Sequence, residues 1–133
     1  MKAMFAKRGL WWMAVVLLSS ALMAAVGPTS DDTRIDSGKG TTNYGTATSL
    51  TVSSTSTALI RPNLQSLPTG VTSTNISKAT LTIFVTAVST AGAIDVFPVT
   101  GAWTESAVTY NTRPTLGTTA VATGVSITTG TVG

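Results

Sequence analysis

The 133-residue sequence contains no cysteine and no histidine, and only 10% of its residues are charged. The missing cysteine excludes disulfides and a thiolate nucleophile. Without either residue, the usual zinc sites and the histidine-based acid/base pairs of many enzymes are excluded as well. The length suits one domain, and the low charge argues against a solvated acidic or basic tail.

The positive charge of the chain is concentrated at its N-terminus. A formal net charge of +3 and a pI of about 9.7 would by themselves suggest nucleic acid or a membrane as a partner. However, three of the basic residues precede an apolar run that ends in small residues: Lys2, Lys7 and Arg8. This pattern is typical of a secretory signal peptide. We therefore expect a signal-peptide helix over residues 1–27 and a secreted, extracellular or cell-surface module over residues 28–133.

The cleavage position and the fate of this segment stay open. A cut after Gly27 fits the small-x-small pattern, whereas a cut after Ala25 places the bulky Met23 three residues before it. The alternative is an uncleaved membrane anchor, although the apolar run is interrupted by Ser19 and Ser20 and is short for a bilayer span. Membrane association is expected only through this segment.

Without the predicted signal peptide, the charge of the chain is balanced. The remaining basic residues are Arg34, Lys39, Arg61, Lys78 and Arg113, and the acidic ones are Asp31, Asp32, Asp36, Asp95 and Glu105. No basic patch remains to neutralise phosphates, so nucleic acid is not expected as a partner. Threonine is abundant here, and its β-branched side chain suits the solvent face of a strand.

Alternating hydrophobic patterns predict an all-β fold. The clearest covers residues 79–88, in which the odd-numbered residues from Ala79 to Ala87 would face one side of a strand. A second strand over residues 94–99 would form a hairpin with it. Further strands are predicted over residues 33–36, 47–53, 57–61 and 121–127, with no helix after the signal. Many short strands between turns predict an antiparallel β-sandwich or jelly roll.

Three stretches, taken in order, resemble a known family. They are Asp32–Gly38 followed by Thr42–Gly45, Thr57–Arg61 followed by Leu64–Gly70, and Trp103–Pro114. The last reads Trp-Thr-Glu-Ser-Ala-Val-Thr-Tyr-Asn-Thr-Arg-Pro and is the most specific. Together they are similar to the DNRLRE-type secreted module, also grouped as carbohydrate-binding module family 96, which has alginate-binding members. The resemblance covers about residues 31–133.

The resemblance implies a non-catalytic jelly-roll module attached to secreted polysaccharide-active enzymes or surface proteins. The sequence departs from the family pattern at Pro62 and Asn63, where an aromatic residue and an acid usually follow the strand. The family also continues with further strands past the position of Gly133. We therefore expect an incomplete sandwich, a fragment that is unstable or accepts a strand from a partner.

The aromatic residues of these motifs are candidates for binding polysaccharide, because aromatic faces pack on sugar rings. Asn111 and Arg113 could add hydrogen bonds, and the arginine fork suits a carboxylated sugar such as a uronate. The aromatic candidates are Trp103, Tyr110 and Tyr44. In the alternative interpretation Trp103 and Val108 cap the core, Glu105 pairs with Arg113 and Asn111 holds the loop backbone, so that the protein is a structural or adhesion module without a specific glycan.

Acidic residues raise two further possibilities. Asp31, Asp32 and Asp36 are candidates for a structural calcium ion, which prefers six to eight oxygen ligands. No other cofactor is expected. Glycoside hydrolysis would need two carboxylates across a cleft, and Asp95 and Glu105 have no sequence context that suggests such a pair. The sequence therefore favours a binding module over an enzyme.

Overall fold

The computed structural model describes residues 27–131. Its elements, in chain order, are strand β1 (Thr29–Asp36), 3-10 helix η1 (Ser37–Lys39), strand β2 (Ser56–Pro62), 3-10 helix η2 (Ser73–Asn75), strand β3 (Gly92–Val96), strand β4 (Ala122–Ile127) and 3-10 helix η3 (Thr129–Thr131). The all-β prediction is confirmed, and no α-helix occurs among these residues. The predicted signal peptide lies outside them, except for Gly27.

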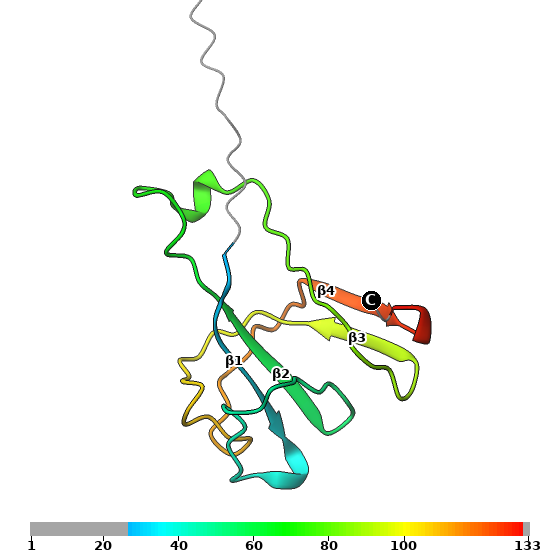
Figure 1. Ribbon diagram of the computed structural model, residues 1–133. Helices are drawn as coiled ribbons and strands as arrows, with labels where there is room; N and C mark the ends of the chain where they lie inside the picture. The colour runs from blue at the N-terminus through cyan, green and yellow to red at the C-terminus, as the bar shows by residue number, and fades with distance from the viewer. Residues whose placement is uncertain (1–26, 132–133) are drawn as a thin grey trace, which may run out of the picture.

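The strands form two antiparallel pairs. β1 pairs with β2, and β3 pairs with β4. In Figure 1 the chain between β3 and β4 leaves the second pair, passes beside β1 and β2, and then returns. Within the described part of the chain, none of the 3-10 helices has the length or apolar character that crossing a bilayer requires.

The core lies on one face of the β1–β2 pair. In the antiparallel register Thr33 is opposite Leu59 and Ile35 is opposite Thr57, so these side chains share a face. Thr33, Ile35 and Leu59 are buried, and Val108 from the long loop after β3 is buried against them. Burying aliphatic side chains of this size stabilises the fold by about 1.5–3 kcal/mol each. This small cluster therefore joins the first strand pair to the loop.

The predicted strand over residues 79–88 is wrong, and so is its hairpin with residues 94–99. Only Val85 has a bridge partner in this segment. Leu81, Ile83 and Phe84 are exposed, Phe84 to 79%. The reason is that a strand needs a neighbour, and β3 pairs with β4 instead. Alternation along the sequence described which side chains could share a face, but not which strand lies beside which.

The other strand predictions agree with the structure to different degrees. Strands predicted over residues 33–36 and 57–61 are confirmed within β1 and β2, and the one over 121–127 is confirmed in β4 except for Val121, which precedes it. The strand over 94–99 is confirmed only in part, because β3 ends at Val96 and only Val99 forms a further bridge, to Leu116. The strand over 47–53 is wrong. There the Ser53 hydroxyl accepts hydrogen bonds from the amides of Thr55 and Ser56, a local arrangement that competes with sheet pairing.

Candidate functional site

The loop from Trp103 to Pro114 carries four of the five predicted ligand-binding residues and begins with a tight turn. The carbonyl of Thr104 accepts hydrogen bonds from the amides of Ala107 and Val108, at 3.2 and 3.0 Å. A second turn follows, in which the amide of Thr109 donates to the Thr112 hydroxyl at 3.0 Å. These local bonds give the loop a defined shape before it contacts the sheet.

Asn43, in the connection between β1 and β2, fixes this loop from outside. Its Nδ2 donates to the carbonyls of Glu105 and Val108, at 2.8 and 2.7 Å. Its Oδ1 accepts from the amide of Gly45 at 3.1 Å. The sequence analysis missed this role, although an asparagine that bonds the backbone two residues on is typical of turns.

The prediction that the Asn111 side chain holds the loop backbone is wrong. Asn111 contributes through its main chain, since its amide donates to the carbonyl of Gly40 at 2.9 Å, and the asparagine whose side chain bonds the loop backbone is Asn43. The two segments approach closely. A Cβ atom on Gly45 would lie 2.4 Å from the Glu105 carbonyl oxygen, so no larger residue fits at position 45 without displacing the loop.

Each of the three candidate aromatic rings has an arginine over one face. The distance from the guanidinium carbon to the ring centroid is 4.5 Å for Arg34 and Tyr44, 4.5 Å for Arg61 and Trp103, and 4.3 Å for Arg113 and Tyr110. These are cation–π contacts. The covered face is therefore not available to a sugar ring unless the arginine moves.

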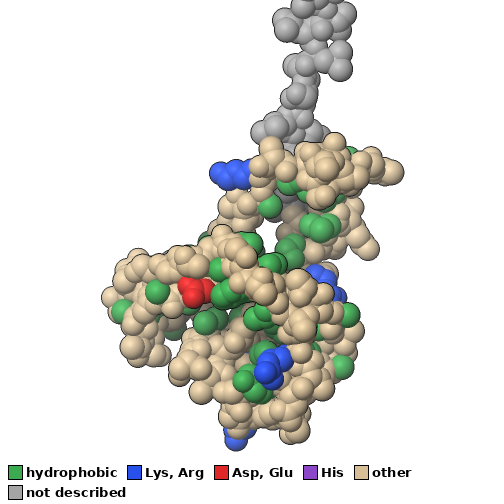
Figure 2. All heavy atoms as spheres, turned by 180° about the vertical axis from the view of Figure 1, so that it is seen from behind, with side chains coloured by type: hydrophobic (Ala, Val, Ile, Leu, Met, Phe, Trp, Pro, Cys, Tyr) green, Lys and Arg blue, Asp and Glu red, His purple; other side chains and the backbone are tan. Residues whose placement is uncertain are grey.

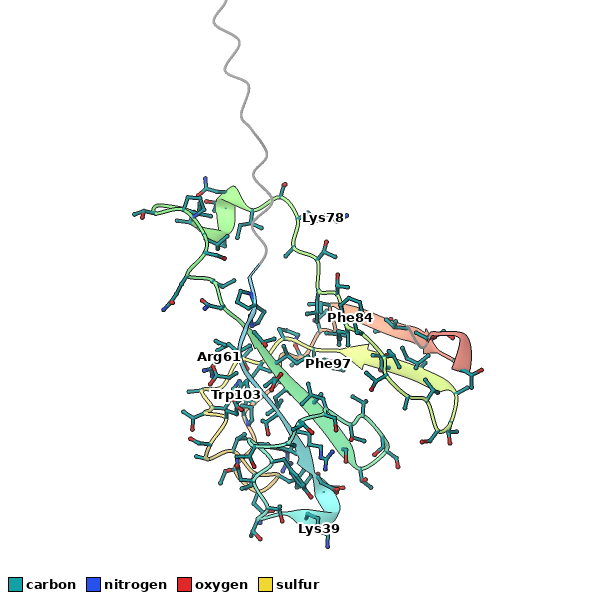
Figure 3. The ribbon with its side chains drawn as sticks, in the orientation of Figure 1. Lys39, Arg61, Lys78, Phe84, Phe97 and Trp103 are labelled. Carbon is teal, nitrogen blue, oxygen red and sulfur yellow. The ribbon has the colours of Figure 1, made fainter. Side chains whose placement is uncertain are left out.

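Trp103 is held in place by Arg61 of β2, whose guanidinium lies over its ring (Figure 3). The Arg61 guanidinium donates to the Trp103 carbonyl and forms an ion pair with Asp31 of β1, with 3.0 Å between Nη1 and Oδ2. Trp103 also packs against the buried cluster of Ile35, Leu59 and Val108. Its contacts are thus those of a residue at the margin of the core.

The predicted ion pair between Glu105 and Arg113 is wrong. Among residues 27–131 the structure contains one ion pair, and it joins Arg61 to Asp31. Arg113 is exposed and donates from Nη1 to the Tyr110 carbonyl at 3.0 Å, which holds it over the tyrosine ring. Its positive charge is therefore not neutralised by a carboxylate of the described chain.

Three of the predicted site residues meet at one hollow of about 610 Å³. Its lining consists of Ile35, Thr57, Leu59, Tyr110, Asn111, Arg113, Pro114, Thr115 and Leu116. The floor is therefore partly aliphatic, and the polar groups are two threonine hydroxyls, an amide, a phenol and a guanidinium. Trp103 and Tyr44 do not line it.

The three predicted calcium ligands do not converge on one point, and two of them have other partners. Asp31 pairs with Arg61, and Asp36 Oδ1 accepts from the amide of Gly38 at 2.8 Å. Asp32 is the neighbour of Asp31 on β1 and so lies on the opposite face of the strand. The part of the chain that the structure describes contains no group of three acidic side chains placed to hold a metal ion, and the calcium site stays a prediction.

Comparison with known proteins bears on the same region. The family model of carbohydrate-binding module family 96 matches residues 24–131, which include both strand pairs and the loop that forms the hollow. No curated protein and no solved structure matches the chain. The family match covers most of the sequence and agrees with the resemblance of the three motifs, so the chain belongs to carbohydrate-binding module family 96.

Proposed function

We propose that this protein is a secreted, non-catalytic module that binds polysaccharide, and that the hollow beside Arg113 is its binding site. The observation that carries the proposal is that Tyr110, Asn111 and Arg113 line one hollow. Membership of a carbohydrate-binding family supports the ligand class. Mixed aliphatic and hydroxyl lining also suits a sugar, which presents both apolar faces and hydroxyl groups.

The charge at the hollow favours a carboxylated sugar, for example a uronate. The guanidinium of Arg113 carries several N–H donors, and one of its nitrogens, Nη1, donates to the Tyr110 carbonyl. A guanidinium binds a carboxylate through two parallel hydrogen bonds, and such charge-assisted bonds are about twice as strong as neutral ones. Stacking on Tyr110 holds the guanidinium in place before the ligand arrives, which lowers the entropy cost of binding.

The proposal includes the setting of the module. The basic start and apolar run of residues 1–27 support export, and the family supports a role as an accessory to a carbohydrate-active or cell-surface protein. We further propose that the two antiparallel pairs belong to a jelly-roll β-sandwich. Their separate pairings and the connection that crosses from one to the other are compatible with that topology.

Affinity electrophoresis in gels with alginate or with a neutral glucan tests this function. We expect alginate to retard the protein, and Arg113→Ala to weaken binding by about 10- to 150-fold, the equivalent of losing hydrogen bonds to a charged group. Arg113→Lys should recover part of the binding, because it restores the charge without the fork. Lys78→Ala removes one charge outside the hollow and is the matched control.

One observation favours the second candidate, a structural or adhesion module without a specific glycan. All three aromatic candidates have an arginine over one face, which leaves them less able to stack on sugars. A folded protein that is not retarded by any polysaccharide would support this second function. Equal loss of alginate binding in Lys78→Ala and Arg113→Ala would instead indicate attraction by net charge alone.

A further inference from the structure

Gly40, the residue that follows η1, lies against the side chain of Asn111 in the candidate site. Lys39, which is labelled in Figure 3, precedes it at this end of η1. A Cβ atom at position 40 would lie 2.6 Å from Asn111 Oδ1 and 3.1 Å from both Cγ and Nδ2. These distances are well inside van der Waals contact. The Asn111 carboxamide therefore occupies the space that any larger residue at position 40 would need.

The backbone of Gly40 does not itself require glycine. Its φ of −51° and ψ of −31° lie in the right-handed helical region, which residues with a side chain adopt readily. The amide of Asn111 donates to the Gly40 carbonyl at 2.9 Å, so the two backbones cannot separate without breaking this bond. A side chain at position 40 is therefore accommodated most easily by rotation of the Asn111 carboxamide, which is the end of a flexible, exposed side chain.

The Asn111 carboxamide has its polar atoms left for a ligand. In the described chain the side-chain hydrogen bonds of this part of the loop come from Thr109, Thr112 and Arg113, and none involves the carboxamide. Asn111 also lines the hollow. A carboxamide offers both a carbonyl acceptor and an NH2 donor, which suits a hydroxyl group in either of its hydrogen-bonding roles.

Charge alone provides little selectivity at this surface. On the face seen in Figure 2 the basic side chains stand apart from one another, with uncharged atoms between them. Among the described residues that line the hollow, Arg113 alone is charged. Its guanidinium suits the carboxylate of a uronate, whereas the hydroxyl groups of the same sugar need neutral partners.

We propose that Gly40 is a positioning residue of the hollow: the space that it leaves holds the Asn111 carboxamide where it hydrogen-bonds the hydroxyl groups of a bound uronate. The inference rests on the proposed function, because it concerns the same hollow. Arg113 binds the carboxylate, and the contact between Gly40 and Asn111 sets which arrangement of hydroxyl groups is accepted.

Gly40→Ala, with Gly38→Ala as the matched control, tests this role. Gly38 lies two residues earlier, and a Cβ atom there would contact only the Asp36 carboxylate, at 3.3 Å. Neither Gly38 nor Asp36 lines the hollow. In affinity electrophoresis we expect Gly40→Ala to weaken alginate binding by about 3- to 10-fold, the equivalent of one lost neutral hydrogen bond, at an unchanged melting temperature. Gly38→Ala should bind as the wild type does.

Three readouts separate positioning from a general structural role. In heteronuclear NMR spectra the Asn111 side-chain amide resonances should shift in Gly40→Ala and stay in place in Gly38→Ala. The affinity lost in Gly40→Ala should be the same factor at low and high salt, because no charge is removed, whereas the loss in Arg113→Ala should shrink as salt rises. Gly40→Ala should cost no affinity in an Asn111→Ala background, because the group that it displaces is already absent.

Failure of this inference is distinguishable from failure of the proposed function. Retardation by alginate that Arg113→Ala weakens and Gly40→Ala leaves unchanged overturns the role of Gly40 alone. An equal loss from Gly40→Ala with and without the Asn111 side chain overturns it too, as does a melting temperature well below that of Gly38→Ala, because the fold rather than the carboxamide then gives way. If alginate does not retard the wild type, the proposed function fails, and unmoved Asn111 resonances in Gly40→Ala overturn the positioning independently.

Discussion

The two strand pairs of this protein differ in what covers them. The β1–β2 pair has a face on which Thr33, Ile35 and Leu59 are 0–4% exposed, because the loop that contains Val108 packs on it. The β3–β4 pair has no buried residue, and Val125 is 41% exposed. Both pairs are antiparallel and both contain β-branched residues in alternation. Alternation is therefore not sufficient for a core, which requires a second layer over the apolar face.

The contrast also bears on the proposed binding site. The covered pair provides the wall of the hollow at Arg113, where rigid support of the polar groups is needed for recognition. The following substitutions test whether the two strand pairs differ in burial and in their contribution to stability.

The largest effect is expected for Leu59→Ala in β2. Leu59 is 2% exposed and contacts the small cluster, so its truncation should lower the free energy of unfolding by about 2–5 kcal/mol. Val125→Ala in β4 is the matched control and should cost under about 1 kcal/mol, because the side chain is exposed. Urea denaturation gives both values. Equal losses in the two variants would mean that the two halves are covered to the same degree.

Trp103→Ala should have the next largest effect on stability, about 2–3 kcal/mol, through lost packing and the lost contact with Arg61. Alginate affinity should change little in the fraction that remains folded, because Trp103 does not line the hollow. Thermal unfolding and affinity electrophoresis separate the two outcomes. Lost retardation at an unchanged melting temperature would place Trp103 in the binding site instead.

Asn43→Ala should lower the free energy of unfolding by about 1–3 kcal/mol, because two loop carbonyls lose their donor. Asn43→Asp keeps the size and the acceptor for Gly45 but cannot donate, so it should be similarly unstable. Denaturant unfolding together with amide exchange in residues 103–114 measures the effect. A stable Asn43→Asp protein would show that the donated bonds do not hold the loop.

The smallest effect is expected for the Asp31–Arg61 pair, in which both side chains are partly exposed, Arg61 by 41%. A double-mutant cycle with Asp31→Asn and Arg61→Gln, each of which removes one charge of the pair, should give a coupling of about 0.2–1 kcal/mol. The coupling should fall in 1 M salt, where charges are screened within a few ångströms. A larger coupling that does not respond to salt would point to a buried pair.

Part of the site could be predicted from the sequence. The Trp103–Pro114 motif identified Tyr110, Asn111 and Arg113, and these residues do line one hollow. The role of Asn43 was not predicted, since its partners lie more than sixty residues away and only the fold brings them into reach. The arginines over Tyr44 and Trp103 were also missed, because these two contacts join positions far apart in the sequence.

By itself, the sequence determined the all-β character of the chain, its balanced charge after the N-terminal segment, and the positions of β1, β2 and β4. These follow from local chemistry, namely β-branched residues, period-two alternation and the turn residues between them. Only the tertiary structure decided that β3 pairs with β4 and that residues 79–88 are left exposed. Strand pairing depends on which segments meet in space, and residues 79–88, with a bridge only at Val85, have no neighbouring layer to cover their apolar face.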